Sequence, residues 1–197
     1  MNAHSFWMFS PAIALWGLLA AAVWHDVRSR RIPNRLVFPG ALLGLLLNCI
    51  PFHVNGVLLP VIGPAGLWLA LAGFATGLGL LLPMYMMKAM GAGDVKMMAM
   101  VGAFLGPYPV AIALLFSLLA GGVMALAVAA FNGTLVKVTV NTYHLLLQSM
   151  MRGVNGDMPR IEAPAVPTGK LPYAIAIATG TTIYLALAAN GRLGVFA

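Results

Sequence analysis

Four carboxylates make up the acidic side chains of this sequence: Asp26, Asp94, Asp157 and Glu162. Asp26 comes at the end of one apolar stretch, directly before a run of arginines, and Asp94 opens another in "GAGDVKMMAM". Asp157 and Glu162 fall in a polar loop, where solvated charge is the expected role. Ionisable groups that adjoin membrane-like apolar segments are costly and often functional. Asp26 and Asp94 are therefore the candidate reactive groups.

A pair of carboxylates that shares one site can perform acid–base chemistry on water. The two cannot comfortably ionise together, so one keeps its proton while the other acts as a base, as in aspartic peptidases. Gly91 and Gly93 stand just before Asp94 and allow another chain, such as a substrate strand, to approach it closely. Structural roles are the alternatives: an ion pair between Asp26 and an arginine, and a helix cap for Asp94.

The elements that position these residues are predicted to be membrane helices. Hydrophobic residues make up 61% of the 197 residues and charged residues only 8%, whereas a soluble domain carries about 25% charged residues. A membrane helix needs about 20 mainly apolar residues. We therefore expect an all-α membrane protein, a bundle of about six transmembrane helices that forms a single domain over residues 1–197. The predicted spans are residues 6–25, 36–52, 65–87, 94–107, 109–131 and 171–190.

Basic residues predict how this bundle is oriented, because loops rich in Lys and Arg stay cytoplasmic. With six spans, the loops after the first, third and fifth spans hold nearly all of them, and the opposite side holds Arg192. Both termini are then expected outside the cytoplasm, and Asp26 and Asp94 at cytoplasmic helix ends. The net charge of +7 reflects this topology and contact with anionic lipid. Nucleic-acid binding is not expected, since the charges are scattered over short loops.

Residues 132–168 depart from the span pattern and are expected to form a cytoplasmic loop with an amphipathic segment. The histidines lie in separate segments without metal-ligand spacing, so no metal site is predicted. The single cysteine, Cys49, excludes a disulfide within the chain.

Two segments resemble the type IV prepilin peptidases, a family of intramembrane aspartyl peptidases with a GxGD signature. "GAGDVKMMAMVGAFLG", from residue 91, is similar to that signature. "DVRSRRIPNRL", from residue 26, is similar to the stretch that holds the family's first catalytic aspartate. The pattern of six spans, the short length and "KLPYAIAIATG" near the end resemble the small members that serve tight-adherence, Flp-type pili.

The resemblance implies that Asp26 and Asp94 are the catalytic pair, that Gly91 and Gly93 shape the site, and that no cofactor is needed. It implies an enzyme of the bacterial inner membrane that removes the leader of membrane-inserted prepilins or pseudopilins at the cytoplasmic face, typically after a glycine. Larger members also N-methylate the new terminus through an additional cytoplasmic domain that often holds paired cysteines. No such segment occurs in this sequence, so methylation is not expected.

Three other classes of protein stay open on the residues alone. A proton-coupled transporter or channel could also use paired aspartates, although it would more often place them near the middle of the membrane. A presenilin-type peptidase shares GxGD, but its YD and PAL strings are absent from this sequence. A non-catalytic pilus assembly factor would tolerate asparagine at both positions.

Overall fold

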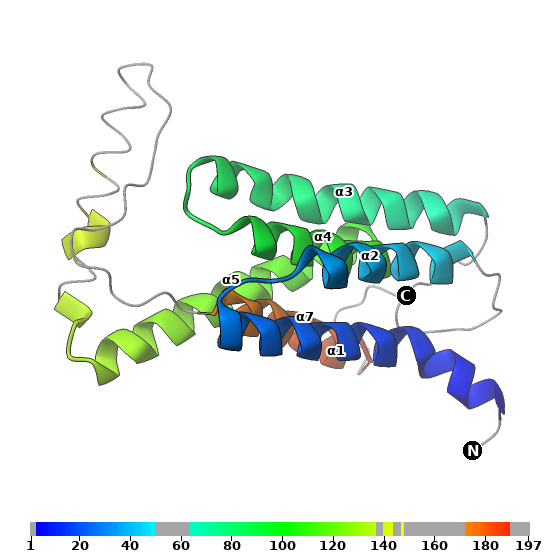
Figure 1. Ribbon diagram of the computed structural model, residues 1–197, viewed down its shortest axis with the longest axis horizontal. Helices are drawn as coiled ribbons and strands as arrows, with labels where there is room; N and C mark the ends of the chain where they lie inside the picture. Colours follow the sequence, from blue (N-terminus) through cyan, green and yellow to red (C-terminus); the bar gives the residue numbers. More distant parts are fainter. Residues whose placement is uncertain (1–2, 50–63, 137–139, 144–146, 148–171, 190–197) are drawn as a thin grey trace.

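The described part of this computed structural model is all-helical (Figure 1). It comprises residues 3–49, 64–136, 140–143, 147 and 172–189, with side chains described at all of these except residues 3–10 and 64–65. Within those ranges no strand is present. The helices are α1 (Ala3–Ser29), α2 (Asn34–Cys49), α3 (Pro64–Met86), α4 (Ala92–Leu105), α5 (Pro107–Phe131) and α7 (Tyr173–Ala189).

Each of the six predicted apolar stretches coincides with one of these helices, which confirms the all-α fold class. The predicted break at residues 106–109 is also present, and its geometry explains why α4 and α5 are separate helices. Gly106 has a φ of 86°, a backbone conformation that residues with a side chain rarely adopt. Pro107 then occupies the first position of α5, where its missing N–H costs no helical hydrogen bond. The predicted loop at 132–168 lies largely outside the described residues.

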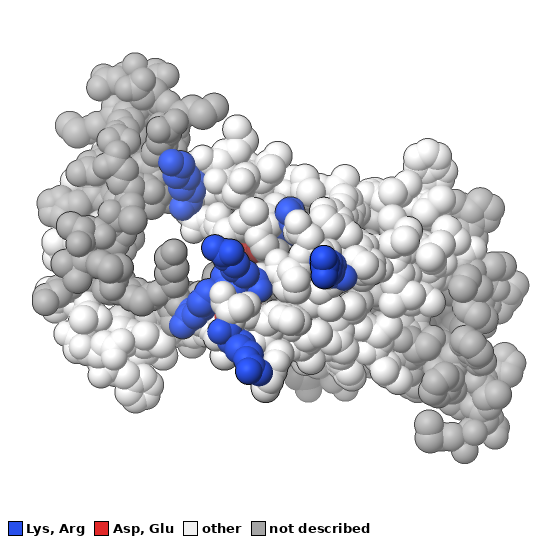
Figure 2. Space-filling model, viewed as in Figure 1, with Lys and Arg blue, Asp and Glu red and all other residues white. Residues whose placement is uncertain are grey.

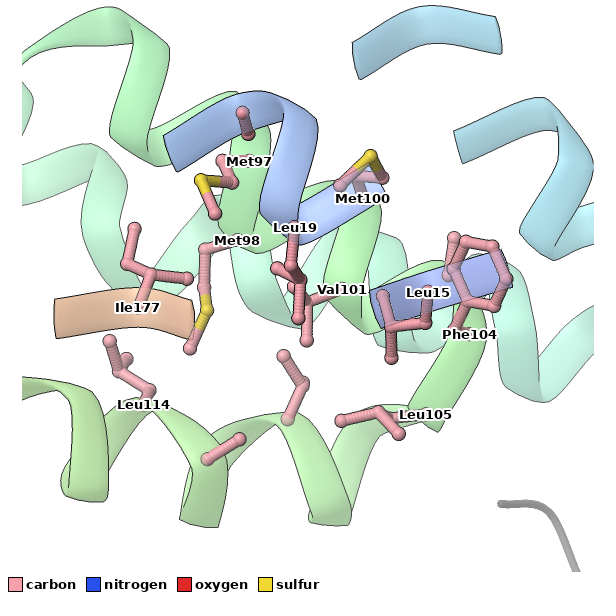
Figure 3. Close-up of a cluster of buried hydrophobic side chains, with 14 of the residues drawn as sticks. Leu15, Leu19, Met97, Met98, Met100, Val101, Phe104, Leu105, Leu114 and Ile177 are labelled. Atoms are coloured by element: carbon pink, nitrogen blue, oxygen red, sulfur yellow. The ribbon is translucent and has the colours of Figure 1, made fainter. Parts of the chain in front are cut away.

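Helix α4 forms the centre of the bundle. Every residue of α4 from Met97 to Leu105 is buried, and Figure 3 shows its side chains packed among residues from α1, α5 and α7. Three methionines on α4 contribute to this core, and their flexible thioethers can fill irregular gaps. The labelled core residues are Leu15, Leu19, Met97, Met98, Met100, Val101, Phe104, Leu105, Leu114 and Ile177. Because α4 is enclosed by its neighbours, its position fixes where Asp94 lies.

Glycines bring α3 and α4 together at backbone distance. A Cβ atom added to Gly73 on α3 would collide with the Gly102 carbonyl oxygen and would lie 2.6 Å from the Cα atom of Gly106. A Cβ atom added to Gly102 would likewise collide with the Gly73 carbonyl. Small residues at helix crossings allow such close packing in membrane proteins. The contact sets the separation of α3 from the central helix.

Two of the described helices are long and apolar enough to cross a membrane: Gly66–Met86 in α3 and Pro107–Phe131 in α5. Helices α2 and α7 are apolar but shorter, at 16 and 17 residues. The 14 residues of α4 extend about 21 Å, less than the roughly 30 Å of a hydrocarbon core. The stretch predicted at residues 94–107 has the same length as α4 and is shifted by two residues. Its apolar character does not by itself indicate a membrane crossing, because an enclosed core helix is as apolar as a lipid-facing one.

The end of α1 and the starts of α4 and α7 lie toward the same end of the bundle (Figure 1). Helix α1 runs toward this end, whereas α4 and α7 run away from it. Residues that are distant in sequence, from the arginine run after Asp26 to the start of α7, are thus brought to one end of the molecule.

Candidate active site

Asp26 lies within the last turn of α1 and is buried, with an exposed fraction of 8%. The helix does not stop at this residue as predicted, because the N–H of Arg30 donates to the Asp26 carbonyl at 2.8 Å and extends the helical pattern. The structure gives the Asp26 carboxylate a backbone partner, and the neighbouring arginines are exposed. Its Oδ2 atom accepts a hydrogen bond from the N–H of Ala174, 3.2 Å away at the start of α7.

Asp94 lies in the first turn of α4, three residues after Gly91, which occupies the N-cap position. Its backbone N–H donates to the Gly91 carbonyl at 3.2 Å. The carboxylate turns back toward the same residue, since a Cβ atom on Gly91 would lie 3.1 Å from Asp94 Oδ2. Gly91 is exposed. The missing side chain therefore leaves this side of the carboxylate uncovered.

The two aspartates are close enough to interact electrostatically, although 68 residues separate them in the sequence. Figure 2 shows a small patch of acidic surface surrounded by Lys and Arg side chains. Asp26 and Asp94 are the acidic residues within the described ranges, so the red atoms come from one or both of them. Two neighbouring carboxylates disfavour simultaneous ionisation. The arrangement can hold one proton between them and polarise a water molecule.

The segment before Asp94 packs against the loop that follows Asp26. A Cβ atom on Gly93 would lie 3.3 Å from the Ile32 Cβ atom, tighter than ordinary contact. Lys96 donates from Nζ to Asn34 Oδ1 at 3.1 Å and lies 5.6 Å from the centre of the Phe38 ring. Lys96 thus has a specific partner on α2. These contacts hold the two aspartate-bearing segments together.

The remaining candidates take no part in this described site. Asp157 and Glu162 lie outside the described residues. Within the described ranges, no group of three His, Cys, Asp or Glu side chains is placed to hold a metal ion. His25 is exposed.

Sequence reasoning missed the start of α7. Tyr173 is half-buried and interacts electrostatically with Asp94, and the next residue supplies the hydrogen bond to Asp26. Two signals were available in the sequence: Pro172, which marks a helix start, and the resemblance of "KLPYAIAIATG" to the small members of the family. Neither indicates what that helix contacts.

A family model described as the type IV leader peptidase family matches residues 13–126. The match covers more than half of the chain and includes both aspartates. The chain therefore belongs to the type IV leader peptidase family. No curated protein and no solved structure matches it.

Gly93→Val is expected to reduce peptidase activity more than stability. The larger side chain must displace Ile32 and restricts the backbone beside Asp94, so the pair is misaligned before the core is affected. The measurement compares the amount of detergent-extracted protein with the cleavage rate per molecule. A parallel loss of both would assign Gly93 a packing role only.

Proposed function

We propose that this protein is an aspartic endopeptidase of the inner membrane that removes the leader from type IV prepilins or pseudopilins at the cytoplasmic face, after a glycine. The observation that carries the proposal is that Asp26 and Asp94 lie near enough to interact electrostatically, in a chain that belongs to this family. The exposed backbone at Gly91 offers an approach for the leader. N-methylation is not part of the proposal.

The proposed reaction uses the two carboxylates and one water molecule. One carboxylate takes a proton from the water, whose oxygen attacks the scissile carbonyl carbon, while the proton held by the other carboxylate is donated to the carbonyl oxygen. The tetrahedral intermediate then collapses, the C–N bond breaks, the leaving amine takes up the proton held by the pair, and one hydroxyl of the intermediate gives its proton back to the pair as the new carboxyl group forms. The pair returns to its shared-proton state. Neither aspartate is assigned a fixed role, because the members of a coupled pair titrate together.

The reaction class can be tested by co-expression with a candidate pilin, followed by determination of the pilin's N-terminal residue. We expect a new terminus between a glycine and a hydrophobic run. An intact leader in the presence of folded protein would count against the peptidase. Proton or solute flux in liposomes containing the purified protein would then favour the transporter alternative.

Reporter fusions test the proposed topology. Fusions at residues 32, 90 and 155 should all report a cytoplasmic location, because the basic loops are expected there. The matched control is a fusion after residue 189, which should report the opposite side. A periplasmic signal at residue 90 would separate the loop before Asp94 from the loop after Asp26, and would rule out the proposed site.

A further inference from the structure

The first turn of α7 lies beside both aspartates and contacts Asp26 directly. The N–H of Ala174 donates to Asp26 Oδ2 at 3.2 Å, across 148 residues of sequence. The side chain of Tyr173 lies within electrostatic range of Asp94. A single turn of helix therefore adjoins the carboxylate from α1 and the carboxylate from α4.

The bond to Asp26 satisfies a requirement of the helix start. The first N–H groups of a helix have no acceptor within the helix, and a Ser, Thr, Asp or Asn side chain just before the helix commonly supplies one. Pro172 precedes α7 and has no such side chain. The carboxylate of Asp26 takes this role from another helix. Its Oδ2 atom is thereby held by the first turn of α7.

The position of the Tyr173 ring is set by α5. A Cβ atom added to Gly121 would lie 2.6 Å from the ring atom Cε2 and 3.1 Å from the phenol oxygen. The ring therefore rests directly on the α5 backbone, and Gly121 provides the space for it. The next residue, Gly122, has no neighbour within 4 Å of such an added atom. Of these two glycines, it is therefore Gly121 that must lack a side chain for the Tyr173 ring to fit.

We propose that the first turn of α7 is a positioning element of the aspartate pair, in which the Ala174 N–H orients Asp26 and the ring of Tyr173, seated on Gly121, holds this turn in place against α5. The inference rests on the proposed peptidase function and adds a third element to the site. The family match ends at residue 126, so this turn lies outside the matched segment. Misplacement of catalytic groups by about 1 Å can cost roughly 100-fold in rate. Loss of either contact should therefore appear in kcat.

Tyr173→Phe removes the phenol oxygen and keeps the ring on Gly121. Gly121→Ala instead displaces the ring, and Gly122→Ala is the matched control because its added methyl group meets no neighbour. We expect kcat per folded molecule to fall about tenfold or more in Gly121→Ala, with KM nearly unchanged, whereas Tyr173→Phe should stay close to the wild type because the ring keeps its seat. The pH–rate profile of kcat should also shift in Gly121→Ala, because the displaced turn withdraws the Ala174 N–H from the Asp26 carboxylate. Gly122→Ala should match the wild type in both measurements.

Proline substitutions test the backbone contact. Ala174→Pro removes the donor to Asp26, whereas Ile175→Pro removes an N–H that donates to the Pro172 carbonyl at 3.2 Å. Both positions are in the first helical turn, where proline is tolerated. We expect kcat of Ala174→Pro to be at least about tenfold below that of Ile175→Pro. Thermal melting in detergent measures the fraction of each variant that is folded, and each rate is divided by that fraction.

Two kinds of failure can be distinguished. If the wild type cleaves prepilin but Gly121→Ala keeps its kcat and pH profile, and both proline variants are equally active, the positioning role is wrong and the peptidase stands. If the wild type and an Asp26→Asn, Asp94→Asn double variant are equally inactive on every prepilin tested, the proposed function itself is overturned, and the positioning role falls with it.

Discussion

Replacing either Asp26 or Asp94 by asparagine is expected to abolish prepilin cleavage, with a loss of at least about 10³-fold in kcat. Asparagine keeps the size of the side chain but removes the titratable proton and the base. At position 26 the amide oxygen can still accept the Ala174 N–H, so α7 keeps its partner. The variant protein should therefore insert and fold. Cleavage is measured on purified protein in detergent or liposomes, and folding by thermal melting.

Two control variants accompany these substitutions. Asp157→Asn and Glu162→Gln should be nearly silent, because these carboxylates are expected to be solvated. Wild-type activity should fall at both acidic and alkaline extremes, as expected for a coupled pair that works in its singly protonated state. A metal chelator should not change the rate. Retained cleavage by folded Asp26→Asn, in a host without its own prepilin peptidase, would overturn the two-aspartate mechanism even if Asp94 proved essential.

The helical framework was largely predictable from the sequence. Apolar runs interrupted by proline and glycine marked all six helices, and the break between α4 and α5 was placed correctly because "GPYP" combines a backbone conformation favoured by glycine with a missing N–H donor. The candidate pair was selected because its members are carboxylates beside apolar segments. Carboxylates in such positions are easy to recognise in a chain with so few charges. Their proximity was expected because both helix ends were predicted to lie on the same side of the bundle.

The supporting contacts were not predictable, because they depend on how helices pack. Nothing in the local sequence shows that Gly93 faces Ile32, that Lys96 donates to Asn34, or that Tyr173 rests on Gly121. These contacts link segments that are far apart in the chain. The full burial of α4 was missed for a similar reason, since a helix surrounded by protein and a helix surrounded by lipid need the same apolar side chains.

Gly73→Ala is expected to cost about 3 kcal/mol of stability, at the upper end for overpacking of a core. The added methyl group meets the backbone of Gly102 and Gly106, which cannot move aside as a flexible side chain would. Helix α3 must then move away from α4, and the enclosed core around Met98 and Phe104 loses contacts.

The matched control on the same helix is Gly79→Ala, which has no neighbour within 4 Å of the added atom. Alanine favours helix by about 1 kcal/mol over glycine, so this variant should be as stable as the wild type or more so. Opposite shifts in melting temperature for the two variants would establish that the α3–α4 contact holds the central helix in place. Because α4 carries Asp94 at its start, Gly73→Ala should also lower the cleavage rate of the protein that remains folded. Equal melting temperatures would mean that α3 and α4 do not need this close approach.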